Sequence, residues 1–423
     1  MTLLRKAMAA EVKKVPIPRR GVDYRGKVVL APMVRSGELP SRLLALHYGA
    51  DLVWGPETVD RAMIGTTRRV NEDLKTVDWI KGLTHQKKGA GQTPTENIIY
   101  RVYPEREGKQ LVFQIGSSDP DLAVEAARLV AADVAGIDVN AGCPKPFSTS
   151  GGMGAALLRT PDKLCAILEA LVKNIVPEFD IGISVKIRIL ETAAETEELV
   201  RKLCKTGITG LTVHCRTTPM RPREKAIRGQ LRMVADICRE HGVACLMNGD
   251  VTSKEEGLKL AEEFGADGAM IAVAAEKNPS CFRSEGGLVP WQESVEEYLK
   301  ICMETNNRWA NTKYLLTQMI PGKSDGKYQA VTQAKCYGDI MKILGHDHLI
   351  ETSQKTDVRL GLNTAERKSQ PNSQQKRKPD SSMNSTGAQK KQKQNQQRSP
   401  ASKHEPLSTS KPEVEPEAVA SAS

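Results

Sequence analysis

One cysteine stands between a predicted strand and a glycine-rich loop, a place where a thiol can do chemistry. The stretch GIDVNAGCPKPFSTSGGMGAALL, residues 136–158, begins with a short apolar run that ends at Asn140. Cys143 follows three residues later, next to Pro144. A thiol with the usual pKa of about 8.5 is protonated at neutral pH and can act as a general acid. A lone cysteine more often serves as a small buried hydrophobic residue, so the elements around it must decide between the two roles.

Eight apolar runs of strand length occupy residues 27–274, and most of them are followed by a helical pattern. Their continuous apolarity predicts strands covered on both faces, as in a parallel sheet. Gly49, Gly207, Gly242 and Gly265 precede strands, where positive φ can end a helix. Eight units over about 250 residues predict a TIM (β/α)8 barrel rather than a doubly wound open sheet, which needs five or six strands. The predicted strands are residues 27–33, 51–57, 110–116, 136–142, 183–189, 210–216, 244–250 and 268–274.

The segments outside these strands complete an α/β fold with a C-terminal helical domain and a disordered tail. Residues 1–24 are predicted to be a disordered extension, residues 25–287 the barrel, and residues 288–352 a helical domain. The polar stretch 82–97 is predicted to be a loop. Residues 353–423 are predicted to be a disordered tail, because residues 364–403 hold ten Lys or Arg against two acids and no aromatic residue. An acidic end follows this basic segment.

Composition excludes several classes of protein. The chain has 423 residues and a net charge of +10. Its nine cysteines include no CxxC pair, which indicates a reduced intracellular protein. It has no apolar run of about 18 residues, so we expect no membrane span. It has no spaced cluster of His and carboxylates, so we expect no metal. We expect a location in the cytoplasm or nucleus. Basic clusters at 376–378 and 390–393 suit nuclear import or RNA binding but equally a solvated tail, and the basic N-terminus also suits a mitochondrial presequence.

The ends of the predicted strands define the chemistry, since a TIM barrel carries its active site at the C-terminal ends of its strands. The polar groups there are amides, a lysine, a histidine and a thiol, without a carboxylate pair for glycoside hydrolysis. This set suits a flat heteroaromatic ring with carbonyl edges, and backbone N–H groups after the last two strands suit a phosphate. We therefore expect flavin mononucleotide (FMN) across the mouth of the barrel. The strand-end residues are 31–35, Gln114, Asn140, Cys143, Lys186, Arg188, 214–216, 248–250 and 272–273.

A flavin barrel gives the thiol a chemical task. Reduction of a uracil ring adds a hydride at C6 and needs a proton at C5 from the opposite face, which a protonated Cys143 could supply. The loop CRTTPMRPREKAIRG, residues 215–229, follows the sixth strand and carries five basic residues. A basic rim beside the pocket suits a substrate that is one flipped base of a polyanion, although a solvated loop remains the alternative.

Five motifs together resemble the tRNA-dihydrouridine synthases, over about residues 24–345. The nearest class is the eukaryotic one that acts on uridine 20 of the D-loop, in a fungal form. The resemblance implies an FMN barrel and a helical tRNA-binding domain, with NADPH as reductant, and we expect a monomer. The motifs are VLAPMVRSGELPSRLLALHYGADLVWGPE, GIDVNAGCPKPFSTSGGMGAALLRTPDKL, VKIRI, LTVHCRT and NTKYLL.

The resemblance also implies residue roles. Cys143 would be the proton donor to uracil C5, and Asn140 would contact the uracil or its ribose. The flavin-binding set would be Pro32, Met33 and Val34 under the ring, Gln114, Lys186 and His214 at its polar edge, and Asn248, Gly249, Asp250, Ala272 and Val273 around ribityl and phosphate. Further contacts to tRNA are expected from Arg188, Arg216, Arg221, Arg223 and Lys313.

Two departures from the family pattern stand out. The family usually has Gly-Arg or Ala-Arg after the eighth strand, and its arginine meets the flavin phosphate. This chain has Ala272-Val273, so the phosphate contact would fall to backbone amides or to another basic residue. Animal relatives also end in a double-stranded-RNA-binding domain, and the sequence after residue 352 shows none. Two rival functions stay open: a flavin barrel that acts on a free pyrimidine, as dihydroorotate dehydrogenase does, and a tRNA-binding barrel without catalysis.

Overall fold

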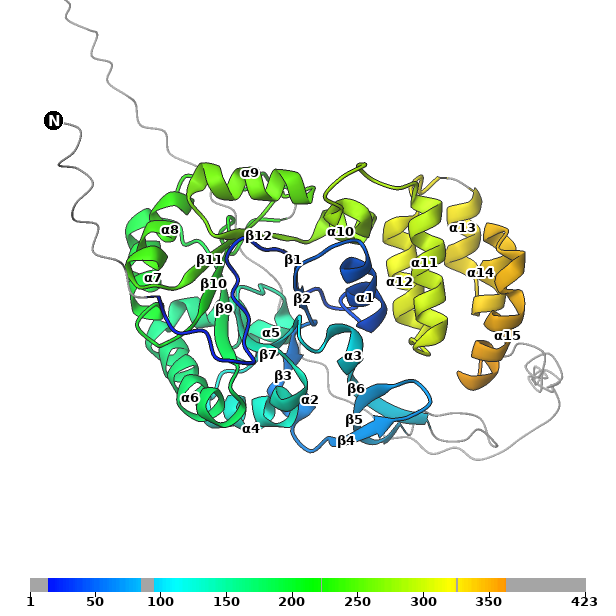
Figure 1. Ribbon diagram of the computed structural model, residues 1–423, viewed down its shortest axis with the longest axis horizontal. Helices are drawn as coiled ribbons and strands as arrows, with labels where there is room; N and C mark the ends of the chain where they lie inside the picture. The colour runs from blue at the N-terminus through cyan, green and yellow to red at the C-terminus, as the bar shows by residue number, and fades with distance from the viewer. Residues whose placement is uncertain (1–13, 85–94, 222, 325, 363–423) are drawn as a thin grey trace, which may run out of the picture. The chain divides into compact units, whose positions relative to one another are not determined.

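Eight parallel strands close into a barrel in the computed structural model, which describes residues 14–84, 95–221, 223–324 and 326–362 (Figure 1). The strand order is β2-β1-β12-β11-β10-β9-β8-β7, and β2 pairs with β7 to close the ring. This confirms the predicted TIM barrel. The short strand β3 (Thr58–Val59) also pairs with β7. The barrel strands are β1 (Val28–Leu30), β2 (Val53–Trp54), β7 (Leu111–Gly116), β8 (Gly136–Ala141), β9 (Gly182–Arg188), β10 (Gly210–His214), β11 (Ala244–Asn248) and β12 (Gly268–Ile271).

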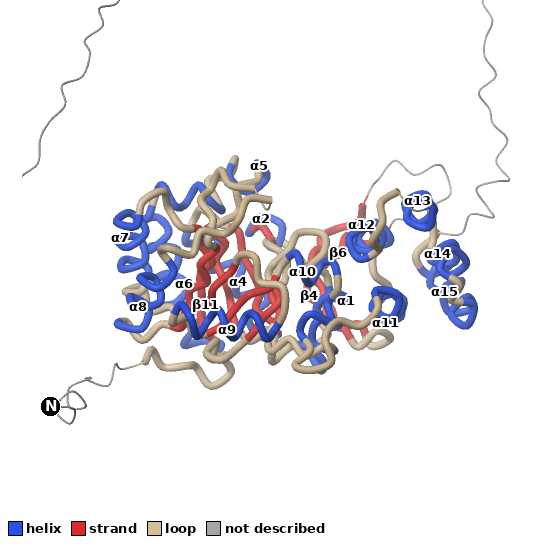
Figure 2. Tube along the Cα trace, turned by 90° about the horizontal axis from the view of Figure 1, so that it is seen from above, coloured by secondary structure: helices blue, strands red, loops and turns tan. Residues whose placement is uncertain are grey.

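Helices surround these strands, as Figure 2 shows for α6, α7, α8 and α9. Several begin with a side-chain cap. Thr192 and Glu195, for example, form a reciprocal capping box at the start of α7. Gly49, Gly207, Gly242 and Gly265 all have positive φ, as expected of residues that end helices. The helices up to residue 277 are α1 (Leu39–His47), α2 (Asp60–Met63), α3 (Pro104–Glu107), α4 (Pro120–Val130), α5 (Pro146–Thr149), α6 (Pro161–Phe179), α7 (Ala193–Leu203), α8 (Leu231–Glu240), α9 (Lys254–Phe264) and α10 (Val273–Lys277).

The segment before β1 packs against the barrel, so the prediction of a disordered extension is wrong for residues 14–24. The Val15 N–H donates to the Gly242 carbonyl at 3.1 Å. The Tyr24 side chain is 1% exposed, and a Cβ at Gly210 would collide with its ring. Gly136 and Gly210 begin two strands, so Tyr24 fills the end of the barrel opposite the strand C-termini. Residues 1–13 lie outside the described residues.

An antiparallel three-stranded sheet stands where the sequence predicts a loop at 82–97. Its strands are β4 (Thr67–Asn71), β5 (Thr76–Thr84) and β6 (Thr95–Val102), so both ends of the predicted loop are strand. Val77 and Trp79 on β5 and Tyr100 and Val102 on β6 are buried, an alternation typical of a half-buried strand. Residues 85–94, the middle of the predicted loop, lie outside the described residues.

Five α-helices of the described residues follow the barrel, and the last of them reaches beyond the predicted boundary at residue 352. They are α11 (Trp291–Glu304), α12 (Trp309–Met319), α13 (Gly326–Gln333), α14 (Tyr337–Leu344) and α15 (Ile350–Arg359). The buried Asp357 carboxylate on α15 accepts hydrogen bonds from the Tyr337 and Gly338 N–H groups, at 2.8 and 2.9 Å. This contact fixes α15 against the start of α14, so residues 353–359 belong to the helical region rather than to the predicted tail. The basic clusters at 376–378 and 390–393 lie outside the described residues.

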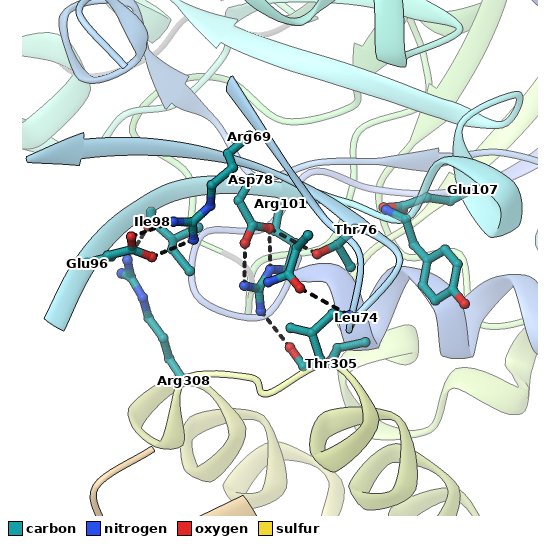
Figure 3. A network of polar contacts seen from close by, with 12 residues as sticks. Arg69, Leu74, Thr76, Asp78, Glu96, Ile98, Arg101, Glu107, Thr305 and Arg308 are labelled. Carbon is teal, nitrogen blue, oxygen red and sulfur yellow. Dashed lines mark hydrogen bonds and ion pairs between the residues drawn. The ribbon is translucent and has the colours of Figure 1, made fainter. Parts of the chain in front are cut away.

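A polar network joins the inserted sheet to the helical region (Figure 3). The Arg101 guanidinium on β6 donates to both Asp78 carboxylate oxygens, at 2.6 and 2.7 Å, and to the Thr305 carbonyl at 2.6 Å. Arg308, just before α12, contacts the Ile98 carbonyl. The barrel, the sheet and the helices therefore form one compact unit, which holds α12 beside the mouth of the barrel.

Candidate active site

A pocket of about 300 Å³ opens at the C-terminal ends of the barrel strands. Twelve of the eighteen residues predicted for the site line it, and they come from seven strands and the loops after them. The fold therefore brings together side chains that are up to 241 positions apart in the sequence. The twelve are Pro32, Met33, Val34, Gln114, Asn140, Cys143, Lys186, Arg188, His214, Asn248, Ala272 and Val273.

A chain of hydrogen bonds orients the amides. Gln114 Nε2 donates to the buried Asp138 carboxylate at 2.8 Å, so its carbonyl oxygen faces Asn140 Nδ2 at 3.1 Å. Asn140 Oδ1 in turn accepts from the Gly142 and Cys143 N–H groups, at 2.9 and 3.0 Å. The Asp138 side chain, whose pKa burial raises to about 6, thus fixes both amides from beneath the pocket.

Positively charged residues lie on one side of the pocket, where burial lowers the pKa values of Lys186 and His214. Burial and then the neighbouring Arg188 charge lower the pKa of Lys186 to about 8. Lys186 Nζ donates to Asn248 Oδ1 at 3.0 Å. Burial and the positive charges of Lys186, Arg188 and Arg216 lower the pKa of His214 to about 2, which leaves a neutral imidazole at physiological pH. One cation and one neutral histidine therefore stand side by side, and both can donate hydrogen bonds to an electron-rich ring.

The Cys143 thiol is half-buried in the pocket wall and protonated at neutral pH. Burial raises its pKa first, and the Glu57 carboxylate adds to the increase. The glycine run shapes its loop: Gly154 has φ of 56°, and a Cβ there would collide with Ser148 Oγ and the Cys143 carbonyl. The Ala155 N–H donates to that carbonyl at 2.9 Å. The loop thus holds a thiol in the state that a general acid requires.

Six predicted residues do not line the pocket. The Arg216 side chain is only 5% exposed; it pairs with Asp250 and donates to the Glu224 carbonyl at 2.7 Å, so it stabilises the basic loop. Gly249 is buried with φ of 124°. Arg221 and Arg223 are exposed on the loop after β10. Lys313 Nζ donates to the Ala334 carbonyl at 3.0 Å and so joins α12 to the end of α13.

At the end of the pocket near β11 and β12, the residues that follow β12 are Ala272 and Val273, and neither is an arginine. The side chain of Val273 is 49% exposed there. Arg228 from the basic loop lies beside the turn 248–250, where its Nη2 donates to the Gly249 and Asp250 carbonyls at 2.9 and 3.1 Å. Its Nε is buried and has no hydrogen-bond partner among the described residues. Arg228 therefore stabilises the turn after β11, although it is not among the residues that line the pocket.

Seven pocket residues lie outside the predicted set of site residues: Ala31, Glu57, Gly142, Pro144, Lys145, Glu276 and Tyr314. Glu57 could have been found, because it closes the second predicted strand, DLVWGPE, in the same position as the other strand-end residues. Tyr314 could not, because its place depends on how α12 packs. Its ring stacks against the Arg35 guanidinium, with 4.3 Å between Cζ and the ring centroid.

The residues that line the pocket suit a flavin. Ala31, Pro32 and Met33 give an apolar surface for a flat ring, while Lys186, Gln114 and His214 give donors for a polar edge. Within residues 14–84, 95–221, 223–324 and 326–362 no His, Cys, Asp and Glu cluster could hold a metal ion. No helix in the same ranges is long and apolar enough to span a membrane.

Comparisons with known proteins identify the family of this chain. Residues 29–343 match the model of the family described as dihydrouridine synthase (Dus). The chain is 49% identical to the tRNA-dihydrouridine(20) synthase [NAD(P)+] of Schizosaccharomyces pombe, over 76% of this chain and 65% of that one, so it spans slightly less than two thirds of that relative. It is 46% identical to the Saccharomyces cerevisiae enzyme of the same name, over 72% of this chain and 79% of that one.

The likeness to other members of the group is lower. The tRNA-dihydrouridine(20a/20b) synthase [NAD(P)+] of S. cerevisiae is 27% identical over 62% of this chain and 64% of that one. Because the family model covers well over half of the chain and ends within α14, it includes both the barrel and most of the helical region. The chain belongs to the dihydrouridine synthase family.

Proposed function

We propose that this protein is a tRNA-dihydrouridine synthase that reduces the C5=C6 bond of uridine 20 in the D-loop. The observation that carries the proposal is a protonated Cys143 thiol in a pocket whose other polar groups are amides, a lysine and a neutral histidine. The choice of position 20 rests on the names of the two fungal relatives, at 49% and 46% identity against 27% for the 20a/20b enzyme.

FMN is the proposed cofactor, with NADPH as the reductant. When bound, FMN supplies the hydride that reaches uracil C6. Met33 and its neighbours would lie under the ring, and Lys186, Gln114 and His214 would donate to its carbonyl edge. The phosphate would meet Arg228 and the backbone around residues 249 and 273, because Val273 cannot bind an anion through its side chain.

The protein's own groups would perform the proton transfer. Cys143 would give its S–H proton to C5, on the face opposite the hydride. Asn140 would hold the thiol in place through its bonds to the Gly142 and Cys143 N–H groups. Arg188 donates to the Gly142 carbonyl at 2.8 Å and so fixes the other side of the same loop.

The tRNA would approach over the mouth of the pocket. Arg221 and Arg223 are exposed on the loop after β10 and can meet phosphates. Tyr314 lines the pocket from α12, which gives the helical region a direct place beside a flipped base. The protein would act as a monomer in the cytoplasm or nucleus.

The test uses purified protein, NADPH and an unmodified transcript of its own tRNA, with dihydrouridine mapped at each nucleotide. We expect a yellow protein and dihydrouridine at position 20 alone. A transcript with cytidine at position 20 and free uridine serve as controls, and neither should be reduced. Reduction of the free pyrimidine would favour a small-molecule enzyme, and a colourless protein that binds tRNA would favour a non-catalytic barrel.

A further inference from the structure

A carboxylate that the sequence analysis did not single out lies in the same pocket as the thiol. Glu57 lies between β2 and β3, at the mouth of the barrel, and lines the pocket. Its Oε1 accepts a hydrogen bond from the buried Ser148 hydroxyl at 2.7 Å. Ser148 belongs to α5, in the same loop as Cys143, so this bond ties the loop to the second strand of the barrel.

The other oxygen of this carboxylate is left without a conventional donor. Glu57 Oε2 is buried and has no hydrogen-bond partner among the described residues. Cys143 lines the same pocket as this carboxylate, whose negative charge raises the pKa of the thiol. The absence of a side chain at Gly116 makes room, since a Cβ there would lie 2.6 Å from Glu57 Oε1. The fold thus places a carboxylate in the same pocket as the thiol and leaves one oxygen of that carboxylate without a hydrogen bond.

The charges around the thiol oppose one another. Lys145, Lys186 and Arg188 all act on Cys143 as cations, and cations favour the thiolate. A thiolate has no proton to donate and is more easily oxidised. Glu57 is an anion in the same pocket, and its charge favours the protonated thiol. Its removal would weaken the opposition to the three cations.

We propose that Glu57 is a positioning residue that keeps Cys143 protonated and therefore able to serve as the acid. The proposal rests on the function proposed above. In the proton-transfer step the S–H bond breaks and the C5–H bond forms, which leaves a thiolate beside the Glu57 carboxylate. Two adjacent negative charges are unfavourable, so the thiolate takes a proton from water and the thiol is restored for the next turnover.

The test measures the protonation of Cys143 directly, in purified protein with its flavin and without tRNA. The rate at which iodoacetamide alkylates Cys143 is followed by peptide mass spectrometry from pH 6 to pH 10. In Glu57→Gln we expect the midpoint of the alkylation rate against pH to fall by about one pH unit. The alkylation rate at pH 7.5 should rise about tenfold, because only the thiolate reacts. Cys165, which is also partly exposed, gives an internal standard in every sample.

Matched variants separate charge from packing. Glu276→Gln removes another carboxylate from the same pocket, one that contacts Ser36, and should leave the Cys143 midpoint where it is. Glu57→Asp keeps the charge and should keep most of the wild-type midpoint. An unchanged midpoint in Glu57→Gln overturns the proposal, and so does an equal drop in Glu57→Asp.

Activity on tRNA separates this proposal from the function on which it rests. If Glu57 controls the acid, the basic limb of the pH–rate profile for dihydrouridine formation moves to lower pH in Glu57→Gln by the same amount as the alkylation midpoint. Wild-type activity together with an unmoved midpoint in the variant rejects only the role of Glu57. Absence of activity in the wild type rejects the function, whatever the alkylation shows.

Discussion

Asn140 Oδ1 accepts a hydrogen bond from the Cys143 N–H at 3.0 Å, so an amide near the end of β8 sets the position of the thiol. The same amide is oriented by Gln114, which is oriented by the buried Asp138. The reactive group is therefore fixed from the core of the barrel, through three side chains on two neighbouring strands.

Asn140→Ala should impair catalysis more than binding. Loss of the amide frees the Gly142 and Cys143 N–H groups, and a misplacement of about 1 Å at a reacting centre can cost about 10²-fold in rate. We expect dihydrouridine formation under single-turnover conditions to fall by about that factor, while the flavin dissociation constant changes little. Asn140→Asp keeps the Oδ1 acceptor and should be less impaired. A rate equal to wild type in the alanine variant would remove Asn140 from the mechanism.

Lys186 makes a specific contribution to pH-dependent stability. Its pKa is about 8 in the folded protein and 10.5 when unperturbed, so between these values the unfolded chain holds a proton that the folded chain lacks. Stability rises with pH wherever the unfolded state binds more protons. From pH 8 to pH 10 the melting temperature of the flavin-free wild type should therefore rise relative to that of Lys186→Met. Parallel curves for the two proteins would contradict the assigned pKa.

Val273→Arg should restore a phosphate contact. The side chain at this position is half exposed just after β12, where the resemblance to the family predicts an arginine. A charge-assisted hydrogen bond contributes about 1.5–3 kcal/mol, which corresponds to at least a tenfold lower dissociation constant for FMN. Arg228→Ala should weaken FMN binding in the otherwise wild-type protein. Fluorescence titration of the flavin-free proteins measures both, and unchanged affinity in both variants would place the phosphate elsewhere.

The two exposed arginines of the basic loop should act on tRNA through charge. Arg221→Ala combined with Arg223→Ala removes two candidate phosphate contacts, so the slope of log affinity against log salt should become shallower by about 1–2. Arg128→Ala, on α4, removes an exposed arginine that pairs with Glu178 and serves as the control. An unchanged slope in the double variant would exclude this loop from the tRNA interface.

The barrel could be predicted from the sequence because its strands are continuous apolar runs with a regular spacing. The position of the pocket could be predicted because a TIM barrel carries its active site at the C-terminal ends of its strands. Twelve of the pocket residues were predicted in this way. The ion pair of Arg216 with Asp250 could not be predicted, because nothing in the sequence shows that the two residues lie side by side. The inserted sheet was not predicted, because the end of β5 and the start of β6 fall within the polar stretch 82–97, whose composition is typical of a loop. Tyr314 reaches the pocket only through the packing of α12, which no local pattern reveals.

The central claim is that Cys143 delivers the proton to uracil C5, and Cys143→Ala tests it most directly. The measurement is dihydrouridine at single-nucleotide resolution on unmodified tRNA, with the variant and the wild type each supplied with flavin and NADPH. The account predicts dihydrouridine at position 20 with the wild type. With the variant it predicts at least 10²-fold slower formation, although flavin and tRNA remain bound. Turnover of the variant at the wild-type rate would contradict it.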